Sequence, residues 1–457
     1  MKPKFVLICI VLFVFLATSC VPSTTTSVPT PTLTAIPTAT TIPTITPTPA
    51  PQSLADAPDL PTWVEEYVHA YGGKVTIDGT EMDADQLTTA IRQNPERFTQ
   101  TKQVDGVKYS FFVVNDIPLG IRESQYITWQ KVHLRDIVEI PGGIEYIGAE
   151  PRIEDNFFDE LNEASSTVET SWAEIEPQRG QYNFTNFDIE IRMLKDHGVL
   201  IREQALLCPS SPTTLPDWLL NGDFSKSELE QILIDHITEV VKHGKELGVT
   251  EWDVVNEPYI PKDRENDIFY KTFGGYSYID VAFTAARKAD PEAKLIYNDI
   301  DNHTANGYLT PLTRETINRL RTETVVGDDG VERTVIDAVG IEGHLGDWMP
   351  VPDFTDVEVT LKSYGLPVII TEFDYNLVGL QGSDQEKFEK QADVYAKFLQ
   401  AAINAGVTEY SFWSFYDKDN FLTDQGITNG DPGLFDKQCK PKMDYYAVLK
   451  VLYENIP

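Results

Sequence analysis

The chain has 457 residues, which is long enough for one large domain with a smaller addition. Its 37 basic and 71 acidic side chains give a formal net charge of −34. A field of that sign repels phosphate backbones, so we expect no nucleic acid partner. A neutral polymer remains compatible with this charge as a ligand.

Residues 1–20 have the pattern of a signal peptide. Lys2 and Lys4 precede an apolar run that is too short for a comfortable membrane span and ends in small residues. The closing Ser19-Cys20 resembles a bacterial lipoprotein cleavage box, in which Cys20 would carry the lipid. We therefore expect an exported protein, either a cell-surface lipoprotein held by membrane lipid or an extracellular protein. The alternative is an ordinary signal peptide with an incidental cysteine.

Residues 21–54 are predicted to be a linker. Up to residue 53 they carry no charge and are mostly Thr, Pro and Ser. Such a composition cannot bury a core, and its prolines keep the chain extended. We expect a stalk that holds the catalytic part away from the membrane.

Residues 55–127 form a predicted small α+β module. Helices are expected over 61–71 and 83–93, and strands over 74–77 and 107–114. Asp78-Gly79, directly after the first of these strands, is typical of a tight hairpin turn. No residue pattern in this module indicates chemistry.

Residues 128–457 alternate short apolar strands with amphipathic helices, which indicates a parallel sheet. Eight strand–helix pairs over this length favour an α/β fold of the (β/α)8, or TIM, barrel type. No G-x-G-x-x-G follows a strand, so a nucleotide cofactor is not expected. The predicted strands begin near Ile144, Ser165, Val199, Glu251, Lys294, Ala338, Val368 and Glu409.

Two of the predicted helices carry N-terminal capping signals, and both end at a glycine. The capping pairs are Ser225 with Glu228 and Ser383 with Glu386, and the glycines are Gly248 and Gly406.

Two of the eight strands end in glutamate, Glu257 on the fourth and Glu372 on the seventh. Catalytic groups of such barrels lie at the carboxyl ends of strands, and these two strands face each other across the mouth. One glutamate alone would fit an ion pair or a helix cap. Two together match glycosidic cleavage, which needs one acid and one group that attacks or stabilises the anomeric carbon.

Seven stretches in order over residues 128–455 resemble the family-10 glycoside hydrolases, the xylanase family. Their order and spacing, more than any single stretch, carry the resemblance. The stretches are Leu134-Arg135-Asp136-Ile137, Trp172-Ala173-Glu174, Asn256-Glu257-Pro258, Tyr297-Asn298-Asp299, Glu342-Gly343-His344, Thr371-Glu372-Phe373-Asp374 and Phe412-Trp413.

The resemblance implies a retaining hydrolase in which Glu257 is the acid/base and Glu372 the nucleophile. Their carboxyl groups would then lie about 5–5.5 Å apart. It also implies that His344 and Asp374 hold the nucleophile, and that Asn256 bonds the sugar 2-hydroxyl. The remaining residues expected at the substrate are Asn298, Glu342, Trp218, Trp413 and Phe421.

The chain departs from the family pattern mainly on the side that binds the non-reducing part of the substrate. Thr167, Val168 and Ser171 replace Glu-Asn-x-x-Lys in the second strand, and the third strand ends Glu203-Gln204-Ala205-Leu206-Leu207-Cys208-Pro209 instead of Gly-His-x-Leu-x-Trp-His. Glu342 and Phe421 stand for a glutamine and a tryptophan. Lost polar partners weaken the binding of sugar hydroxyls, so we expect weak activity on plain xylan.

Three hypotheses remain open from the sequence. The first is an endo-acting hydrolase of β-1,4-linked plant polysaccharide, xylan first. The second is a retaining hydrolase of another polysaccharide on the same barrel. The third is a tethered carbohydrate-binding protein without turnover, which has no need of a nucleophile.

Cysteine and histidine are sparse. Of four cysteines, Cys9 leaves with the signal and Cys20 would be lipidated, so only Cys208 and Cys439 remain in the folded part. A disulfide between them is permitted in an exported protein but is left open. The seven histidines are scattered, and no Cys/His cluster has metal-ligand spacing, so no metal is expected.

Overall fold

A computed structural model describes most of the chain beyond the predicted linker. The described residues are 52–123, 128–151, 156–166, 171–260, 267–327, 329–346, 349–418 and 420–457. Cys20, Thr167 and Val168 lie outside them. Contacts within Ala50–Pro457 form one compact unit. Within the described ranges, no helix has the length and apolarity needed to cross a bilayer.

The described chain begins with a small α+β part. It contains two helices, a short hairpin and an antiparallel four-stranded sheet of order β3-β4-β5-β6. Its elements are η1 (Leu54–Asp56), α1 (Leu60–Ala70), β1 (Val75–Ile77), β2 (Thr80–Met82), α2 (Ala84–Gln93), η2 (Pro95–Phe98), β3 (Thr99–Val104), β4 (Val107–Val114), β5 (Ile117–Glu123) and β6 (Gln130–Lys131).

The β1–β2 hairpin turns at the predicted dipeptide. Asp78 and Gly79 have φ values of 47° and 79°. Both central residues of this two-residue turn need positive φ, which Asp and Gly adopt more readily than most residues. The α+β part packs on the last helix, α15 (Met443–Glu454), where the rings of Phe111 and Tyr453 lie 4.9 Å apart.

Eight parallel strands close into a barrel of order β10-β11-β14-β15-β16-β7-β8-β9. The predicted (β/α)8 fold is therefore confirmed, and each strand begins within two residues of its predicted start. The strands are β7 (Tyr146–Ala149), β8 (Glu163–Ser166), β9 (Leu200–Gln204), β10 (Glu251–Asn256), β11 (Lys294–Ile300), β14 (Ala338–Leu345), β15 (Val368–Tyr375) and β16 (Glu409–Phe412).

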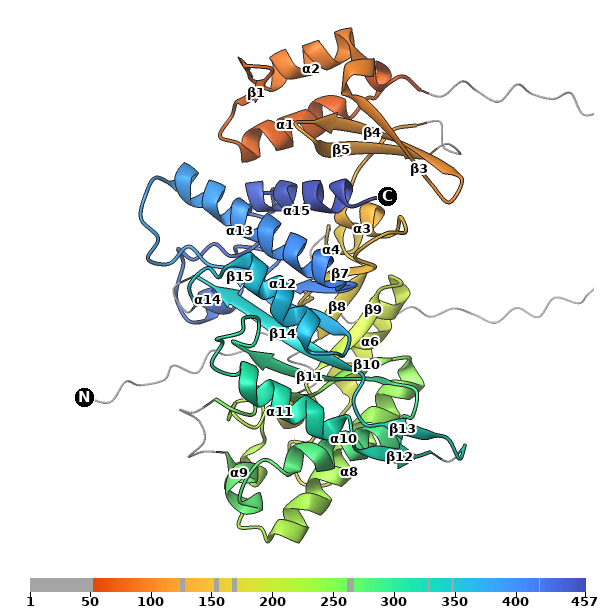
Figure 1. Ribbon diagram of the computed structural model, residues 1–457, viewed down its shortest axis with the longest axis vertical. Coiled ribbons are helices and arrows are strands. Elements are labelled where there is room, and N and C mark those ends of the chain that lie inside the picture. Colours follow the sequence, from red (N-terminus) through yellow and green to blue (C-terminus); the bar gives the residue numbers. More distant parts are fainter. Residues whose placement is uncertain are drawn as a thin grey trace, which may run out of the picture. The chain divides into compact units, whose positions relative to one another are not determined.

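Helices follow the strands and lie around the barrel, with α8, α10, α11, α12 and α13 most visible in Figure 1. The helices and the small hairpin of this part are α3 (Leu134–Val138), α4 (Phe157–Glu160), α5 (Trp172–Ile175), α6 (Thr185–Asp196), α7 (Asp217–Leu220), α8 (Lys226–Leu247), α9 (Ile268–Phe273), α10 (Tyr278–Ala289), α11 (Thr310–Leu320), β12 (Thr324–Val326), β13 (Glu332–Thr334), α12 (Phe354–Ser363), α13 (Asp384–Ala405) and α14 (Phe421–Asp424).

The predicted caps define the two longest helices. The hydroxyls of Ser225 and Ser383 accept from backbone N–H groups three residues on, and Ser383 forms a reciprocal capping box with Glu386. Gly248 and Gly406 end α8 and α13 in the left-handed region. These caps satisfy backbone groups that the helix itself leaves without partners.

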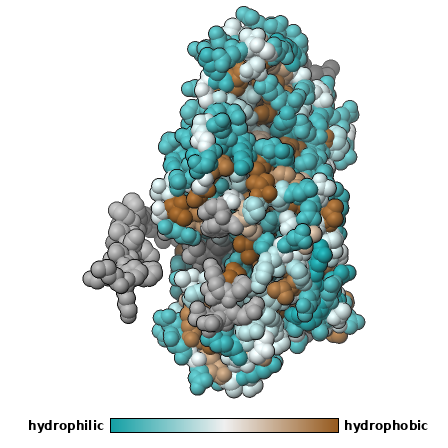
Figure 2. Space-filling model, turned by 60° about the vertical axis from the view of Figure 1, so that its left-hand side comes forward, coloured by the Kyte–Doolittle hydropathy of each residue, from teal (hydrophilic) through white to brown (hydrophobic). Residues whose placement is uncertain are grey.

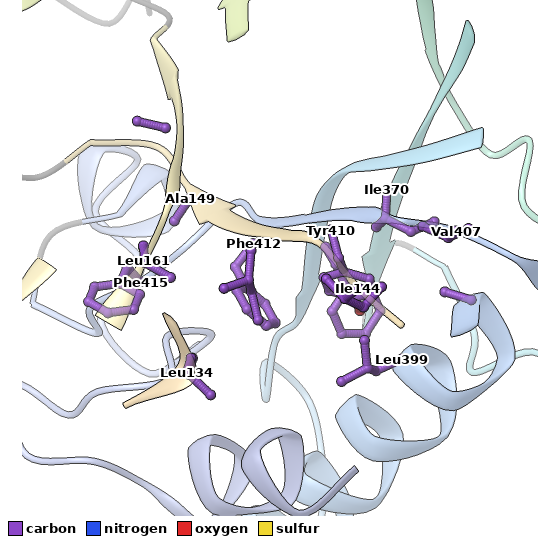
Figure 3. Packing of buried hydrophobic residues seen from close by; sticks show 14 of the residues in the cluster. Leu134, Ile144, Ala149, Leu161, Ile370, Leu399, Val407, Tyr410, Phe412 and Phe415 are labelled. Carbon is purple, nitrogen blue, oxygen red and sulfur yellow. The ribbon is translucent and has the colours of Figure 1, made fainter. Parts of the chain in front are cut away.

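The apolar core lies between the barrel and its helices. On β16, Tyr410 and Phe412 alternate with Ser411 and have rings 5.2 Å apart. Figure 3 shows both rings among buried side chains that include Leu399 of α13. The helix–strand contact is close at Gly244 of α8, where an added Cβ would lie 2.6 Å from the Trp252 ring. Period-two alternation therefore sends apolar side chains outward, and every second residue into the barrel.

The barrel interior is polar, although branched aliphatic side chains usually fill such barrels. Arg202 of β9 is 1% exposed, donates to Asp253 and Ser165, and lies 3.6 Å from Glu163. Its guanidinium also donates to the Thr371 carbonyl at 2.9 Å. One buried arginine thus connects strands from opposite sides of the barrel.

The surface shown in Figure 2 is mainly hydrophilic, with hydrophobic areas scattered between polar ones. Large apolar side chains that are exposed, such as Tyr308 and Val359, are few. This matches the excess of acidic side chains, which favours solubility.

We predict that Arg202→Met destabilises the protein by about 3–5 kcal/mol, because Asp253 and Glu163 would be left buried without their cation. Urea unfolding measures this change. Arg192→Met is the control: Arg192 pairs with Asp188 on the exposed face of α6 and is 62% exposed, so about 0.5 kcal/mol or less is expected. Equal effects of the two substitutions would contradict the account.

Candidate active site

Two barrel strands, β10 and β15, lose regular register at their functional residues. On β10, Asp253 and Val255 pair with consecutive residues of β11, and on β15, Ile370 and Glu372 pair with the consecutive residues Ile341 and Glu342 of β14. Bulges of this kind re-aim side chains and are frequent next to active sites. The carboxyl ends of these strands therefore turn polar side chains toward the barrel mouth.

Glu372 lies at the centre of this group and is 3% exposed. One carboxylate oxygen accepts from the amide of Gln204 and, at 3.3 Å, from Asn298 Nδ2. The other lies 3.0 Å from Nε2 of His344. Hydrogen bonds to both oxygens hold the carboxyl group in one direction, as a nucleophile requires.

His344 is the cation of the site. Its Nδ1 lies 3.0 Å from Asp374 and its Nε2 3.0 Å from Glu372. Burial alone would lower the pKa of His344, but the charges and hydrogen bonds of Asp374 and Glu372 raise that pKa to about 10. The imidazole is therefore protonated at neutral pH and donates to both carboxylates.

Asn298 of β11 connects the two glutamate strands. Its Nδ2 donates to Asn256 at 2.7 Å and Glu342 at 2.9 Å, besides Glu372. Its Oδ1 accepts from Thr371 Oγ at 2.6 Å, which fixes the amide orientation. Gly340 makes room for this pair, since a Cβ there would lie 2.2 Å from Asn298 Oδ1.

Glu257 directly follows β10 and is half-buried. Its φ of 45° is in the left-handed region, which is uncommon for a residue with a Cβ. Its N–H donates to the Asn298 carbonyl at 3.2 Å. This unusual backbone conformation is held by the neighbouring strand, as is common at functional sites.

Glu342 is a third buried carboxyl group beside Glu372, on the neighbouring strand in direct register. Burial raises the pKa of Glu342 well above its ordinary value, and the charges of Glu372, Glu257 and Asp299 raise it further. Burial and Glu257 likewise raise the pKa of the Cys208 thiol to about 12. The mouth of the barrel therefore favours neutral forms of its additional acids.

The predicted aromatic residues divide into two groups. Trp413 and Phe421 both have ring centroids 6.0 Å from that of His344, so they border the nucleophile. Trp218 packs edge-on against Trp172, with centroids 6.5 Å apart, and its indole donates to the Glu176 carbonyl at 2.9 Å. The structure thus places Trp218 with the segments after β8 and β9, not with the His344 group.

Cys208 and Cys439 are free thiols, so the disulfide left open above is not formed. Cys208 lies next to Asn256, whose Nδ2 is 3.8 Å from its sulfur.

Glu342, His344 and Glu372 offer oxygen and nitrogen atoms within 4.8 Å of one another. Both nitrogens of His344 carry protons toward carboxylates, however, and a protonated nitrogen has no lone pair for a metal. We assign no metal site to this group.

Sequence reasoning missed three residues that shape the site: Gln204, Thr371 and Gly340. Gln204 stands where the family has histidine, and it supplies Glu372 with a donor. Thr371 directly precedes the nucleophile in the sequence, and this position was the signal that could have identified it. The role of Gly340 depends on Asn298, a neighbour across the sheet that no local sequence pattern shows.

A closed (β/α)8 barrel with a half-buried glutamate after β10 and a buried glutamate on β15 defines the class of barrel glycoside hydrolases. The chain belongs to glycosyl hydrolase family 10, whose model matches residues 145–451.

Individual relatives agree with this family. The chain is 30% identical over 302 residues to endo-1,4-beta-xylanase B of Thermotoga neapolitana, which covers 65% of this chain and 82% of that protein. The structure of xylanase 10B from Thermotoga maritima superposes with a TM-score of 0.62 at 30% identity, covering 71% and 99% of the two chains. Xylanase 10B from Thermotoga petrophila, in complex with xylobiose, gives 0.61 at 28% identity, covering 72% and 99%.

We predict that Gly340→Ala lowers kcat/KM by about 100-fold, because the new methyl group displaces Asn298 and a shift near 1 Å costs this much. Gly143→Ala is the matched control, since its Cβ would enter open space. Steady-state kinetics on an aryl xylobioside measures both variants. Unchanged activity of Gly340→Ala would show that the position of Asn298 is not needed.

Proposed function

We propose that this chain is an endo-1,4-beta-xylanase that works with retention of configuration, using Glu372 as nucleophile and Glu257 as acid/base. The substrate rests on the names of the relatives and on the xylobiose complex of one of them. The roles rest on the geometry around the two glutamates.

The observation that carries the proposal is the environment of Glu372. A carboxylate that is 3% exposed is costly unless it is hydrogen-bonded and charge-balanced. Here Gln204, Asn298 and His344 donate to its two oxygens, and His344 carries the balancing charge. Such a group is ionised and fixed in direction, as attack on an anomeric carbon requires.

Glu257 suits the complementary role. It is half-buried at the mouth, within the electrostatic reach of Glu342, Asp299 and Cys208. In the first step its carboxylic acid protonates the leaving oxygen while Glu372 forms a bond to the anomeric carbon. In the second step its carboxylate takes a proton from water, which attacks that carbon and releases Glu372.

We expect substrate binding to depend on the two aromatic residues beside the nucleophile. Trp413 and Phe421 border the nucleophile and offer faces on which a sugar ring can pack. Ser171 and Pro209, which replace polar residues of the family, offer fewer donors to sugar hydroxyls than those residues would, and both are buried. We therefore expect weak binding of plain xylan and tighter binding of a decorated or related polysaccharide.

We predict that Glu372→Ala abolishes turnover of every substrate, because no nucleophile remains. Glu257→Ala should keep the first step on substrates with good leaving groups, which need no protonation. Azide should then accelerate its second step by attacking the intermediate without a base. Rates on an aryl xylobioside, with and without azide, measure this pattern.

The same assay on xylan, mannan and a mixed-linkage β-glucan separates the alternative polysaccharides. An active Glu372→Ala variant would overturn the assignment of the nucleophile. Binding of polysaccharide without hydrolysis by the wild type would leave the binding-protein hypothesis.

We also propose that the mature chain begins at Cys20 and is held to a membrane by lipid, with residues 21–53 as the stalk. The apolar run that ends at Ser19-Cys20 supports this. Cys20→Ser should release the enzyme from the membrane fraction into the detergent-free supernatant. A wild-type chain whose mass shows an unmodified start at another residue would contradict the tether.

A further inference from the structure

Two buried carboxyl groups compete for too few donors at the barrel mouth. Glu342 and Glu372 are 2% and 3% exposed, and oxygens of the two lie within 4.8 Å. Asn298 has two amide hydrogens for three acceptors: Asn256, Glu342 and Glu372. These donors are therefore too few to hydrogen-bond both glutamates as ionised carboxylates.

The distances show which glutamate receives the donors. His344 Nε2 lies 3.0 Å from Glu372 but 3.8 Å from Glu342, beyond hydrogen-bond length. Gln204 donates to Glu372. The hydrogen bond that reaches the Glu342 side chain comes from Asn298, at 2.9 Å. Glu372 thus accepts from three side chains, and Glu342 accepts from one.

The charges around Glu342 lead to the same result. Carboxyl groups act on it from β15 (Glu372), from the end of β10 (Glu257) and from β11 (Asp299), and the thiol of Cys208 acts on it from the segment after β9. Two histidines lie nearby. His344 hydrogen-bonds Asp374 and Glu372, and His303 hydrogen-bonds the backbone of Glu342.

His303 does not supply a second cation. Burial lowers the pKa of its imidazole to about 4, so it is neutral in the working range. One positive charge on His344 therefore faces Glu372, Asp374 and Glu342 together. Like charges this close cannot all ionise, and the least solvated group keeps its proton.

We propose that Glu342 acts as a neutral carboxylic acid that positions the nucleophile, in the way an amide would, and that its ionisation switches the site off. This inference rests on the proposed function. A neutral carboxyl group has the shape of a glutamine side chain, with one donor and one acceptor. It accepts from Asn298 without adding charge beside Glu372.

Ionisation of Glu342 would place a second negative charge next to the nucleophile. Burial and the neighbouring carboxyl groups raise the pKa of Glu342 well above its ordinary value, so this ionisation needs a higher pH than that of an exposed glutamate. The two carboxylates would then repel each other, and Glu372 would lose its fixed direction. A glutamine at position 342 keeps the shape and removes the titration.

The test compares Glu342→Gln, Glu342→Ala and the wild type as full chains on 2,4-dinitrophenyl β-xylobioside. This leaving group needs no protonation, so the alkaline fall in kcat/KM does not report Glu257. We expect the fall in kcat/KM at high pH to be shifted to higher pH in Glu342→Gln relative to the wild type. Glu342→Gln should also exceed Glu342→Ala at every pH. Glu389→Gln, on the exposed face of α13, is the control for the charge change and should follow the wild-type profile.

An infrared difference spectrum between the wild type and Glu342→Gln at pH 7 gives a second, substrate-free measurement. We expect the wild type to show a C=O band of a protonated carboxyl group that the variant lacks. If no xyloside is turned over but the band is lost, the proposed function fails and the neutral Glu342 stands. Identical alkaline profiles, or a difference spectrum without the band, overturn the proposal even where the enzyme is active.

Discussion

The site depends on one constraint: a buried carboxylate must be ionised and pointed at an anomeric carbon without water around it. Glu372 meets this constraint only because donors arrive from three other strands. Gln204 comes from β9, Asn298 from β11 and His344 from β14. These segments are far apart in the sequence, and the closed barrel is what brings them to one point. The catalytic chemistry is therefore inseparable from barrel closure.

The same constraint extends below the site into the barrel. Arg202 donates to the carbonyl of Thr371, the residue before the nucleophile, and also pairs with Asp253. Burial raises the pKa of Asp253 to about 7, although the arginine opposes this rise. A polar interior is more costly than an aliphatic one, but it carries positive charge to the backbone beneath Glu372. Arg202 thus contributes both to the stability of the barrel and to the geometry of the site.

Much of the fold could be predicted because its signals are local. Strand starts follow from apolar runs, and helix ends follow from caps such as Ser383 and Gly406. Glu257 and Glu372 could also be found, because each ends an apolar strand with a charge. Local patterns carry no information on register, however.

The interactions that depend on register were not predictable from the sequence. Asn298 reaches Glu342 and Glu372 across neighbouring strands, and the register of β15 shifts around Glu372. Gly340 is needed because of the Asn298 side chain on the next strand. Glu342 was expected at the substrate in place of a glutamine, but its protonation depends on donors that only the folded barrel identifies.

The central claim is that Glu372 forms a covalent bond to the sugar. Incubation of the full chain with a 2-deoxy-2-fluoro xylobioside that carries a good leaving group slows both steps, so the intermediate accumulates. Peptide mapping by mass spectrometry then locates the added sugar. Our account predicts one glycosyl group per chain on the peptide that contains Glu372. A label on another residue, or inversion at the anomeric carbon in the product of an unmodified substrate, would contradict it.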